Sequence, residues 1–432
     1  MRTHNLSRAL RNTWRILRFA LLAGLAAAFL AGSAVPASGL DNQLRALTRQ
    51  LEFDFVTWTL EAFGSKLSGW ALSVERFIDP EDQSRLVLET LDQVATVNRL
   101  NAELLLLYAD PDVPNRESAS RALRVELSTQ QARLDSLAPI AESILQAQLT
   151  SILYDAGISR LGQVFPPPLY QATAAPNNLV VSPRTEIRQV GSLSLEPGLA
   201  ADRRDELETR VFSEFDHAAL VVPVGGIGSY PNLVLQSSNL VWLTEVIAHE
   251  WVHNFLTLRP LGVHIFASPE LYTLNETTAQ LAGEELGLML LKRYYPEHIP
   301  PELLQPPAEI TLPTEDPEPD PDYFDFREQM RITRVEVDRL LAEGLVEEAE
   351  AYMEARRQVF WENGHPVRKL NQAYFAFYGA YNAAPGGGPS GEDPVGPAVV
   401  AFRDQFDKLG EFLNAISWVT SFETLLARMA AA

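Results

Sequence analysis

The sequence contains no cysteine among its 432 residues. Disulfide bonds, thiolate metal sites and cysteine nucleophiles are therefore excluded, so any metal ion must be held by histidine and carboxylate side chains. Positive charge is also scarce, because 35 Lys and Arg face 56 Asp and Glu, a formal net charge of -21. This acidity argues against binding to nucleic acid or to anionic lipid.

The first 37 residues differ from the acidic remainder. They carry five arginines and no acidic residue, and the last of these arginines is followed by the apolar run Phe19–Leu30. Such a segment is typical of an export signal with small residues for cleavage at Val35–Ala37, or of a single uncleaved N-terminal membrane anchor. Without its five positive charges the net charge changes from -21 to -26. In either form the body of the protein is expected outside the cytoplasm, secreted, periplasmic or held at the outer face of the cell membrane.

Apolar spacing predicts a predominantly helical α+β protein. Residues 38–165 show helical periodicity and form a helical N-terminal region. Residues 166–299 form a mixed region, in which 219–224 and 232–235 are expected to pair as a hairpin around a glycine-rich turn. Residues 300–322, rich in proline and acid, are expected to form an extended connector. A helical C-terminal region then covers 323–432.

The most informative pattern is the pentapeptide His249-Glu-Trp-Val-His253, in the middle of a helix predicted from a cap at Ser238 or Asn239 to Thr257. On a helix, positions i and i+4 share a face, so His249 and His253 can bind one metal ion with Glu250 beside it. Zinc at a hydrolytic site takes three protein ligands and one water.

A third ligand is therefore required. A metzincin would carry Gly at 256 and His at 259, but this chain has Leu256 and Arg259, which excludes that class. The better candidate is Glu276, in a second predicted helix. Glu270 and His264 are the alternatives.

The motif together with Asn275-Glu-Thr-Thr-Ala279 resembles the gluzincins, zinc metallopeptidases that pair an HExxH helix with a downstream Asn-Glu-x-x-Ala helix. The resemblance covers about Gly225 to Leu291 and implies zinc bound by His249, His253 and Glu276, with Glu250 as the general base. It also implies that Asn232–Leu235 is an edge strand that binds the substrate backbone. The chain is further similar to uncharacterised exported bacterial zincin-like proteins.

Two supporting roles stay open in the sequence. Gluzincins commonly use a downstream Tyr or His to stabilise the oxyanion. In this chain one helical face carries Asn371, Tyr374, Tyr378 and Tyr381. We predict Tyr378 as the donor. The second ring nitrogen of a metal-bound histidine needs a partner, for which Gln280, Glu284 and Glu245 are the candidates.

The sequence thus predicts an exported zinc metallopeptidase that hydrolyses peptide bonds in a peptide or protein substrate, with a zincin-like core at 166–299 and the C-terminal helices closing the cleft. The alternative is a non-catalytic, zinc-stabilised envelope scaffold or binding protein. Endopeptidase and aminopeptidase action are both open, because an aminopeptidase needs an acidic anchor for the substrate amine that the sequence does not locate.

Overall fold

The computed structural model describes residues 39–72, 74–109, 115–159, 161–304, 324–365, 367–379 and 394–431. The chain divides into two compact units, residues 1–50 and 51–432. The described part of the first unit holds one helix, α2 (Gly39–Thr48). The predicted export segment lies outside the described residues, as does most of the predicted connector.

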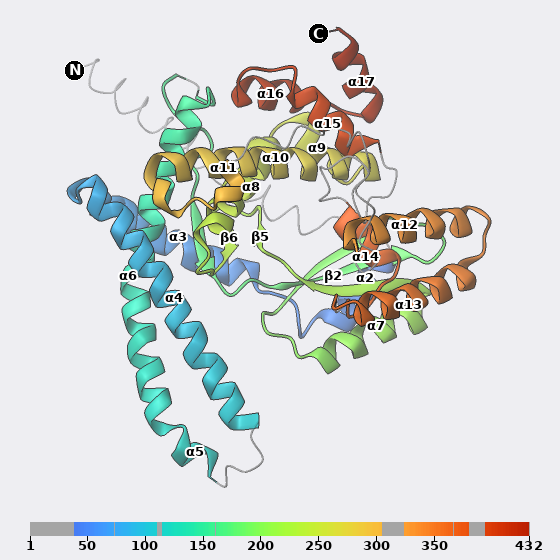
Figure 1. The fold of residues 1–432 in the computed structure, drawn as a ribbon, viewed down its shortest axis with the longest axis horizontal. Helices are drawn as coiled ribbons and strands as arrows, with labels where there is room; N and C mark the ends of the chain where they lie inside the picture. The colour runs from blue at the N-terminus through green and yellow to red at the C-terminus, as the bar shows by residue number, and fades with distance from the viewer. Residues whose placement is uncertain are drawn as a thin grey trace, which may run out of the picture. The chain divides into compact units, whose positions relative to one another are not determined.

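The second unit begins with helices, as the apolar spacing predicts. They are α3 (Phe55–Leu72), η2 (Val74–Phe77), α4 (Pro80–Ala109), α5 (Arg116–Ala119) and α6 (Arg121–Asp155). The long helices α4 and α6 lie side by side (Figure 1). Val94, Val97 and Leu134 form an apolar cluster between them, so burial of these stripes holds the pair together.

Two three-stranded sheets follow. Their strands are β1 (Tyr170–Thr173), β2 (Asn177–Pro183), β3 (Gly191–Leu195), β4 (His217–Pro223), β5 (Gly226–Ile227) and β6 (Asn232–Leu235). One sheet is antiparallel in the order β3-β2-β4. The other has the order β1-β6-β5, with β6 parallel to β1 and antiparallel to β5. The molecule is thus a predominantly helical α+β protein, as predicted.

The predicted hairpin between residues 219–224 and 232–235 is wrong. Strand β4 pairs with β2, whereas β6 pairs with β5, so the two predicted partners belong to different sheets. The expectation that 232–235 is an edge strand is also wrong, because β1 occupies its second side. A parallel partner so distant in sequence leaves no local signal. The outer position beside β6 belongs to β5.

The remaining helices complete the unit. They are α7 (Ala201–Phe215), α8 (Leu240–Thr257), α9 (Pro260–Val263), α10 (Pro269–Tyr294), η3 (Pro296–His298), α11 (Pro301–Leu304), α12 (Phe326–Ala342), α13 (Val346–Glu362), α14 (Gln372–Tyr378), α15 (Val395–Arg403), α16 (Leu409–Ile416) and α17 (Phe422–Ala431). The predicted motif helix is confirmed as α8, and its cap is Asn239, whose side chain accepts from the Trp242 amide at 3.1 Å.

The main apolar core surrounds α8 and α10. Trp251 of α8 is fully buried in it, and its indole Nε1 donates to the Pro166 carbonyl at 2.8 Å. Residues of α4, α6, α15, α16 and α17 belong to the same core, and Figure 1 shows α15 close to α10. The three regions predicted from the sequence therefore share one core, which fixes α8 and α10 from several sides.

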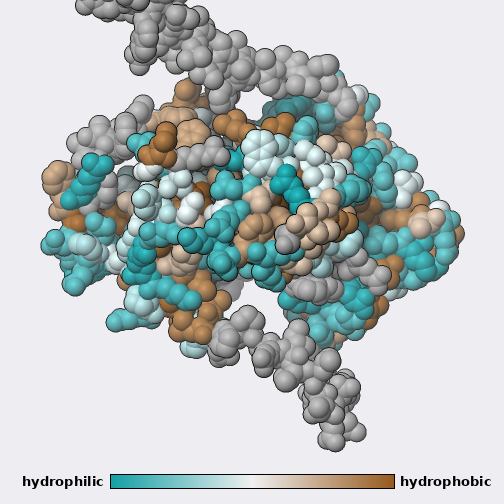
Figure 2. All heavy atoms as spheres, turned by 90° about the horizontal axis from the view of Figure 1, so that it is seen from above, coloured by the Kyte–Doolittle hydropathy of each residue, from teal (hydrophilic) through white to brown (hydrophobic). Residues whose placement is uncertain are grey.

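The surface of the described residues is mixed. Hydrophilic residues cover much of the face shown in Figure 2, and apolar residues form separate patches on it. Among the helices that the structure describes, none is both long enough and apolar enough to cross a membrane.

Candidate metal centre

Three side chains from α8 and α10 converge on one point. The Nε2 atoms of His249 and His253 lie 3.0 Å apart. The Oε2 atom of Glu276 lies 3.6 Å from the first and 3.5 Å from the second. Ligands arranged tetrahedrally around zinc are separated by roughly 3.3 Å, so these three atoms are spaced as a zinc ion requires. His264 and Glu270 are exposed and lie outside this cluster.

The carboxylate of Glu276 fits a metal ion in a second respect. Its Oε2 atom is buried and lies next to the two imidazoles without a hydrogen bond of standard geometry among the described residues, so a cation between them would satisfy it. Burial would raise the pKa of Glu276, but the adjacent His253 and His249 outweigh it and lower the pKa to about 2. Burial likewise would lower the pKa of His253, but Glu276 and Glu250 outweigh it and raise the pKa to about 9. The carboxylate thus stabilises positive charge on the imidazole side of the cluster.

Close contact between α8 and α10 brings the side chains of His249, His253 and Glu276 together. A Cβ atom placed on Gly283 would lie 3.0 Å from the Cβ atom of His249 and 3.0 Å from the backbone oxygen of Glu245. The absence of a side chain at Gly283 lets the two helices approach at the turn that carries His249. Glu276, two turns earlier on α10, then reaches the histidines.

The partner of the second ring nitrogen of His253 is Asn275, which is not among the three residues predicted for this role. The Nδ1 atom of His253 lies 2.8 Å from Oδ1 of Asn275. Because an amide oxygen only accepts, Nδ1 donates this hydrogen bond and Nε2 is left to face the metal position. Asn275 is 1% exposed. The signal was present in the Asn-Glu pair, whereas Gln280 donates to Glu284 instead.

Glu250 lies between the cluster and strand β5. Its side chain is 5% exposed, and burial raises its pKa, against the lowering effect of His249 and His253. A Cβ atom on Gly226 would lie 2.8 Å from Cδ of Glu250. The glycine-rich stretch 225–231, predicted to be a simple turn, therefore includes strand β5. This strand can approach the carboxylate of Glu250 because Gly226 has no side chain.

Two cavities meet at His249 and Glu250. One, of about 340 Å³, is lined by all three ligands and by Ile265, Phe266 and Tyr272. The other, of about 370 Å³, is lined by His249, Glu250, Glu245, Glu284, Trp242 and Tyr378. The ligand cluster is therefore open to space on two sides.

Tyr378 lies in the second cavity, at the end of α14. Helix α14 packs against the β3-β2-β4 sheet through Phe377 and Ala373. The segment before it is anchored by the fully buried carboxylate of Glu208, which lies 2.7 Å from Nζ of Lys369 and accepts from Nη1 of Arg368 at 3.0 Å. Burial raises the pKa of Tyr378, which keeps its hydroxyl protonated.

The other members of the predicted polar face have different positions. Asn371 caps α14 and donates to the Ala219 carbonyl at 2.9 Å. Tyr374 packs its ring 4.5 Å from that of Tyr378, within the apolar clusters beside α14. Tyr381 lies outside the described residues. Of the described tyrosines on this face, Tyr378 alone lines a cavity with His249 and Glu250.

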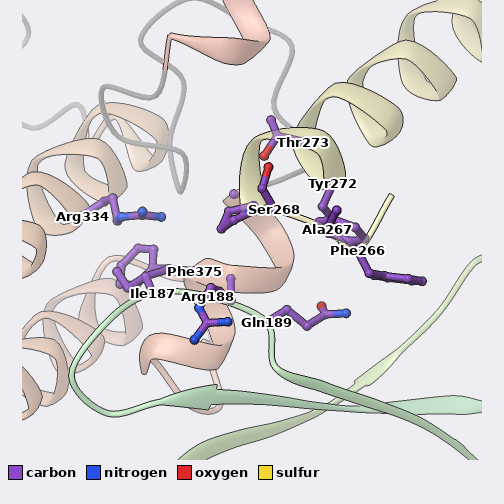
Figure 3. Close-up of a pocket in the computed structure, with 13 residues that line it drawn as sticks. Ile187, Arg188, Gln189, Phe266, Ala267, Ser268, Tyr272, Thr273, Arg334 and Phe375 are labelled. Carbon is purple, nitrogen blue, oxygen red and sulfur yellow. The ribbon is translucent and has the colours of Figure 1, made fainter. Parts of the chain in front are cut away.

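A smaller cavity of about 140 Å³ adjoins the ligand cavity at Phe266 and Tyr272, which line both. Figure 3 shows Phe266 and Tyr272 on one side and Arg334 and Phe375 on the other. The rings of Phe266 and Tyr272 are stacked, with their centroids 6.0 Å apart. This end of the ligand cavity is therefore aromatic.

Two histidines and one carboxylate at these distances can hold one divalent cation, and the cavities leave room beside it for water and a substrate. A buried carboxylate and a protonated tyrosine stand next to that space. No protein-family model, curated protein or solved structure matches this chain. The chemistry assigned to the centre therefore follows from its own residues.

Proposed function

We propose that this chain is an exported zinc-dependent metallopeptidase with a zincin-like core. The convergence of His249, His253 and Glu276 at 3.0 to 3.6 Å is the observation that carries the proposal. Two imidazoles and one carboxylate are a donor set of catalytic zinc sites. When bound by these residues, a zinc ion would supply Lewis-acid chemistry, namely activation of water and of the carbonyl that is attacked.

The chain's own residues would supply the remaining chemistry. Glu250, buried beside the ligands, accepts a proton from the attacking water and delivers it to the leaving amine, and its raised pKa suits both roles. The hydroxyl of Tyr378 donates a hydrogen bond to the oxyanion that develops on the carbonyl. The outer strand β5, next to Glu250, offers main-chain groups to a peptide in extended conformation.

The openness of the centre supports an enzyme over a zinc-stabilised scaffold. Structural zinc sites are enclosed by four protein ligands, whereas catalytic sites keep one position open. Here three ligands line a cavity of about 340 Å³. Among the described residues, no fourth histidine or acid joins this group.

The proposed location and substrates are inferred from the net charge of the chain and from residues 1–37. The basic and apolar residues 1–37 support export or N-terminal membrane anchoring. The net charge of -21 makes nucleic acid an unsuitable partner. Peptides or proteins outside the cytoplasm are the proposed substrates.

The test compares zinc content and peptide hydrolysis for the wild type and Glu250→Gln. Both proteins should bind about one zinc ion per chain, because Glu250 is not a ligand. Hydrolysis of a broad peptide library by the variant should fall at least about a hundredfold. A wild type that binds zinc and cleaves no peptide would instead support the scaffold.

A further inference from the structure

The cavity that contains Tyr378 has a distinct acidic end. Glu245 of α8 and Glu284 of α10 line it together with Trp242 and His249. Glu245 is partly buried and Glu284 is exposed. Burial, and then the charge of Glu284, raise the pKa of Glu245, which indicates that the two carboxylates lie near each other. Like charges so placed repel unless a cation joins them.

Neither carboxylate has a cationic partner among the residues that the structure describes. Glu284 accepts a hydrogen bond from Nε2 of Gln280, a neutral amide. The side chain of Glu245 forms neither an ion pair nor a hydrogen bond with a described residue. The adjacent Glu285 differs, because it forms a bidentate pair with Arg403 at 2.8 and 3.0 Å. Glu285 is thus paired with a cation. Glu245 and Glu284, which line the cavity, have no such partner among the described residues.

A third carboxylate faces the same space. Glu250 lines the cavity, is 5% exposed and has no hydrogen bond to its carboxylate among the described residues. A buried, unpartnered carboxylate aimed into a cavity indicates a donor that arrives with a ligand. Trp242 and Tyr378 also line this cavity, and aromatic faces favour cationic nitrogen over neutral groups.

The acidic end lies one helical turn from the metal ligands. Glu245 precedes His249 by four residues, so both side chains lie on the same face of α8 about 6 Å apart along its axis. In a peptide with a free amino terminus, the first carbonyl carbon is only two bonds from the amine nitrogen. An amine held near Glu245 would therefore present the first peptide bond to the zinc position.

We infer that Glu245, assisted by Glu284 at the rim of the cavity, binds the protonated amino terminus of the substrate, so that the enzyme removes residues from the amino end of peptides. This inference rests on the proposed peptidase function. Glu245 neutralises the ammonium group, and the aromatic end at Phe266 and Tyr272 receives the residues that follow the cleaved bond.

The experiment uses three tripeptide amides: Leu-Ala-Ala, its N-acetylated form, and N-acetyl-Lys-Ala-Ala. Binding to the zinc-loaded Glu250→Gln protein is measured by calorimetry, and hydrolysis by the wild type is measured in parallel. The free-amine peptide should bind about tenfold or more tightly than either acetylated peptide, as expected for a hydrogen-bonded charge.

Adding Glu245→Gln to the Glu250→Gln protein should remove most of this preference. Glu297→Gln, on an exposed residue outside both cavities, changes the net charge equally and should leave it intact. Equal binding of free and acetylated Leu peptides, or equal effects of the two added substitutions, would overturn the inference. Preference for the acetylated Lys peptide would also overturn it, by assigning the cavity to a side chain. A binding preference without hydrolysis of any peptide would contradict the proposed function and leave the amine site supported.

Discussion

The Nδ1 atom of His253 lies 2.8 Å from Oδ1 of Asn275, the residue that directly precedes Glu276 on α10. Two successive residues of one helix therefore face the same histidine, one at each of its ring nitrogens. Asn275 holds the imidazole in the tautomer and orientation that direct Nε2 toward the metal position. The Asn-Glu pair thus acts as a unit in this centre.

Replacing Asn275 by Ala should weaken zinc binding by about ten- to a hundredfold, because Nδ1 of His253 loses its acceptor. Asn275→Asp supplies an acceptor oxygen at the same place and should bind zinc with near wild-type affinity. Competition with a fluorescent chelator measures both affinities. Equal affinities for the wild type and Asn275→Ala would contradict the orienting role.

Replacing Glu276 by Ala should abolish stoichiometric zinc binding, because only two ligands remain. Zinc that binds the folded state raises the unfolding temperature, so added zinc should stabilise the wild type and leave Glu276→Ala unchanged in thermal unfolding. His264→Ala is the matched control, since His264 is exposed and outside the cluster. A zinc-stabilised Glu276→Ala protein would show that another residue completes the site.

Replacing Tyr378 by Phe should lower kcat by about a hundred- to a thousandfold, as for the loss of an oxyanion donor. KM and zinc content should change little, because the ring and its packing remain. Tyr374→Phe removes a hydroxyl from the neighbouring ring, which lies among apolar residues beside α14, and should retain activity. Steady-state kinetics of the two variants distinguish a hydroxyl that acts on substrate from one that serves packing.

Replacing Gly226 by Ala places a methyl group 2.8 Å from Cδ of Glu250. The carboxylate or the strand must then shift, and a displacement of about 1 Å can lower kcat/KM about a hundredfold. Zinc content should stay unchanged, because the ligands lie on α8 and α10. Gly64→Ala is the control, since its methyl group meets no atom within 4 Å. Full activity of Gly226→Ala would argue against close approach of β5 to Glu250.

Sequence alone determined the parts of the site that local geometry controls. The four-residue spacing of His249 and His253 places both on one helical face whatever surrounds them, and Asn239 caps that helix as its residue type predicts. The downstream Asn-Glu-x-x-Ala pattern identified Glu276 as the third ligand candidate, and the structure brings it within 3.6 Å of both histidines.

Tertiary structure alone decided the surroundings of these three side chains. Because β1 pairs with β6, the outer strand next to Glu250 is β5 and not β6. The absence of a side chain at Gly283 allows α8 and α10 to pack closely. Glu208 holds the segment before α14, which carries Tyr378 at the cavity. The acidic end formed by Glu245 and Glu284 likewise exists only where the two helices meet. These relationships join residues far apart in the chain, and their energies come from packing and pairing that no local propensity encodes.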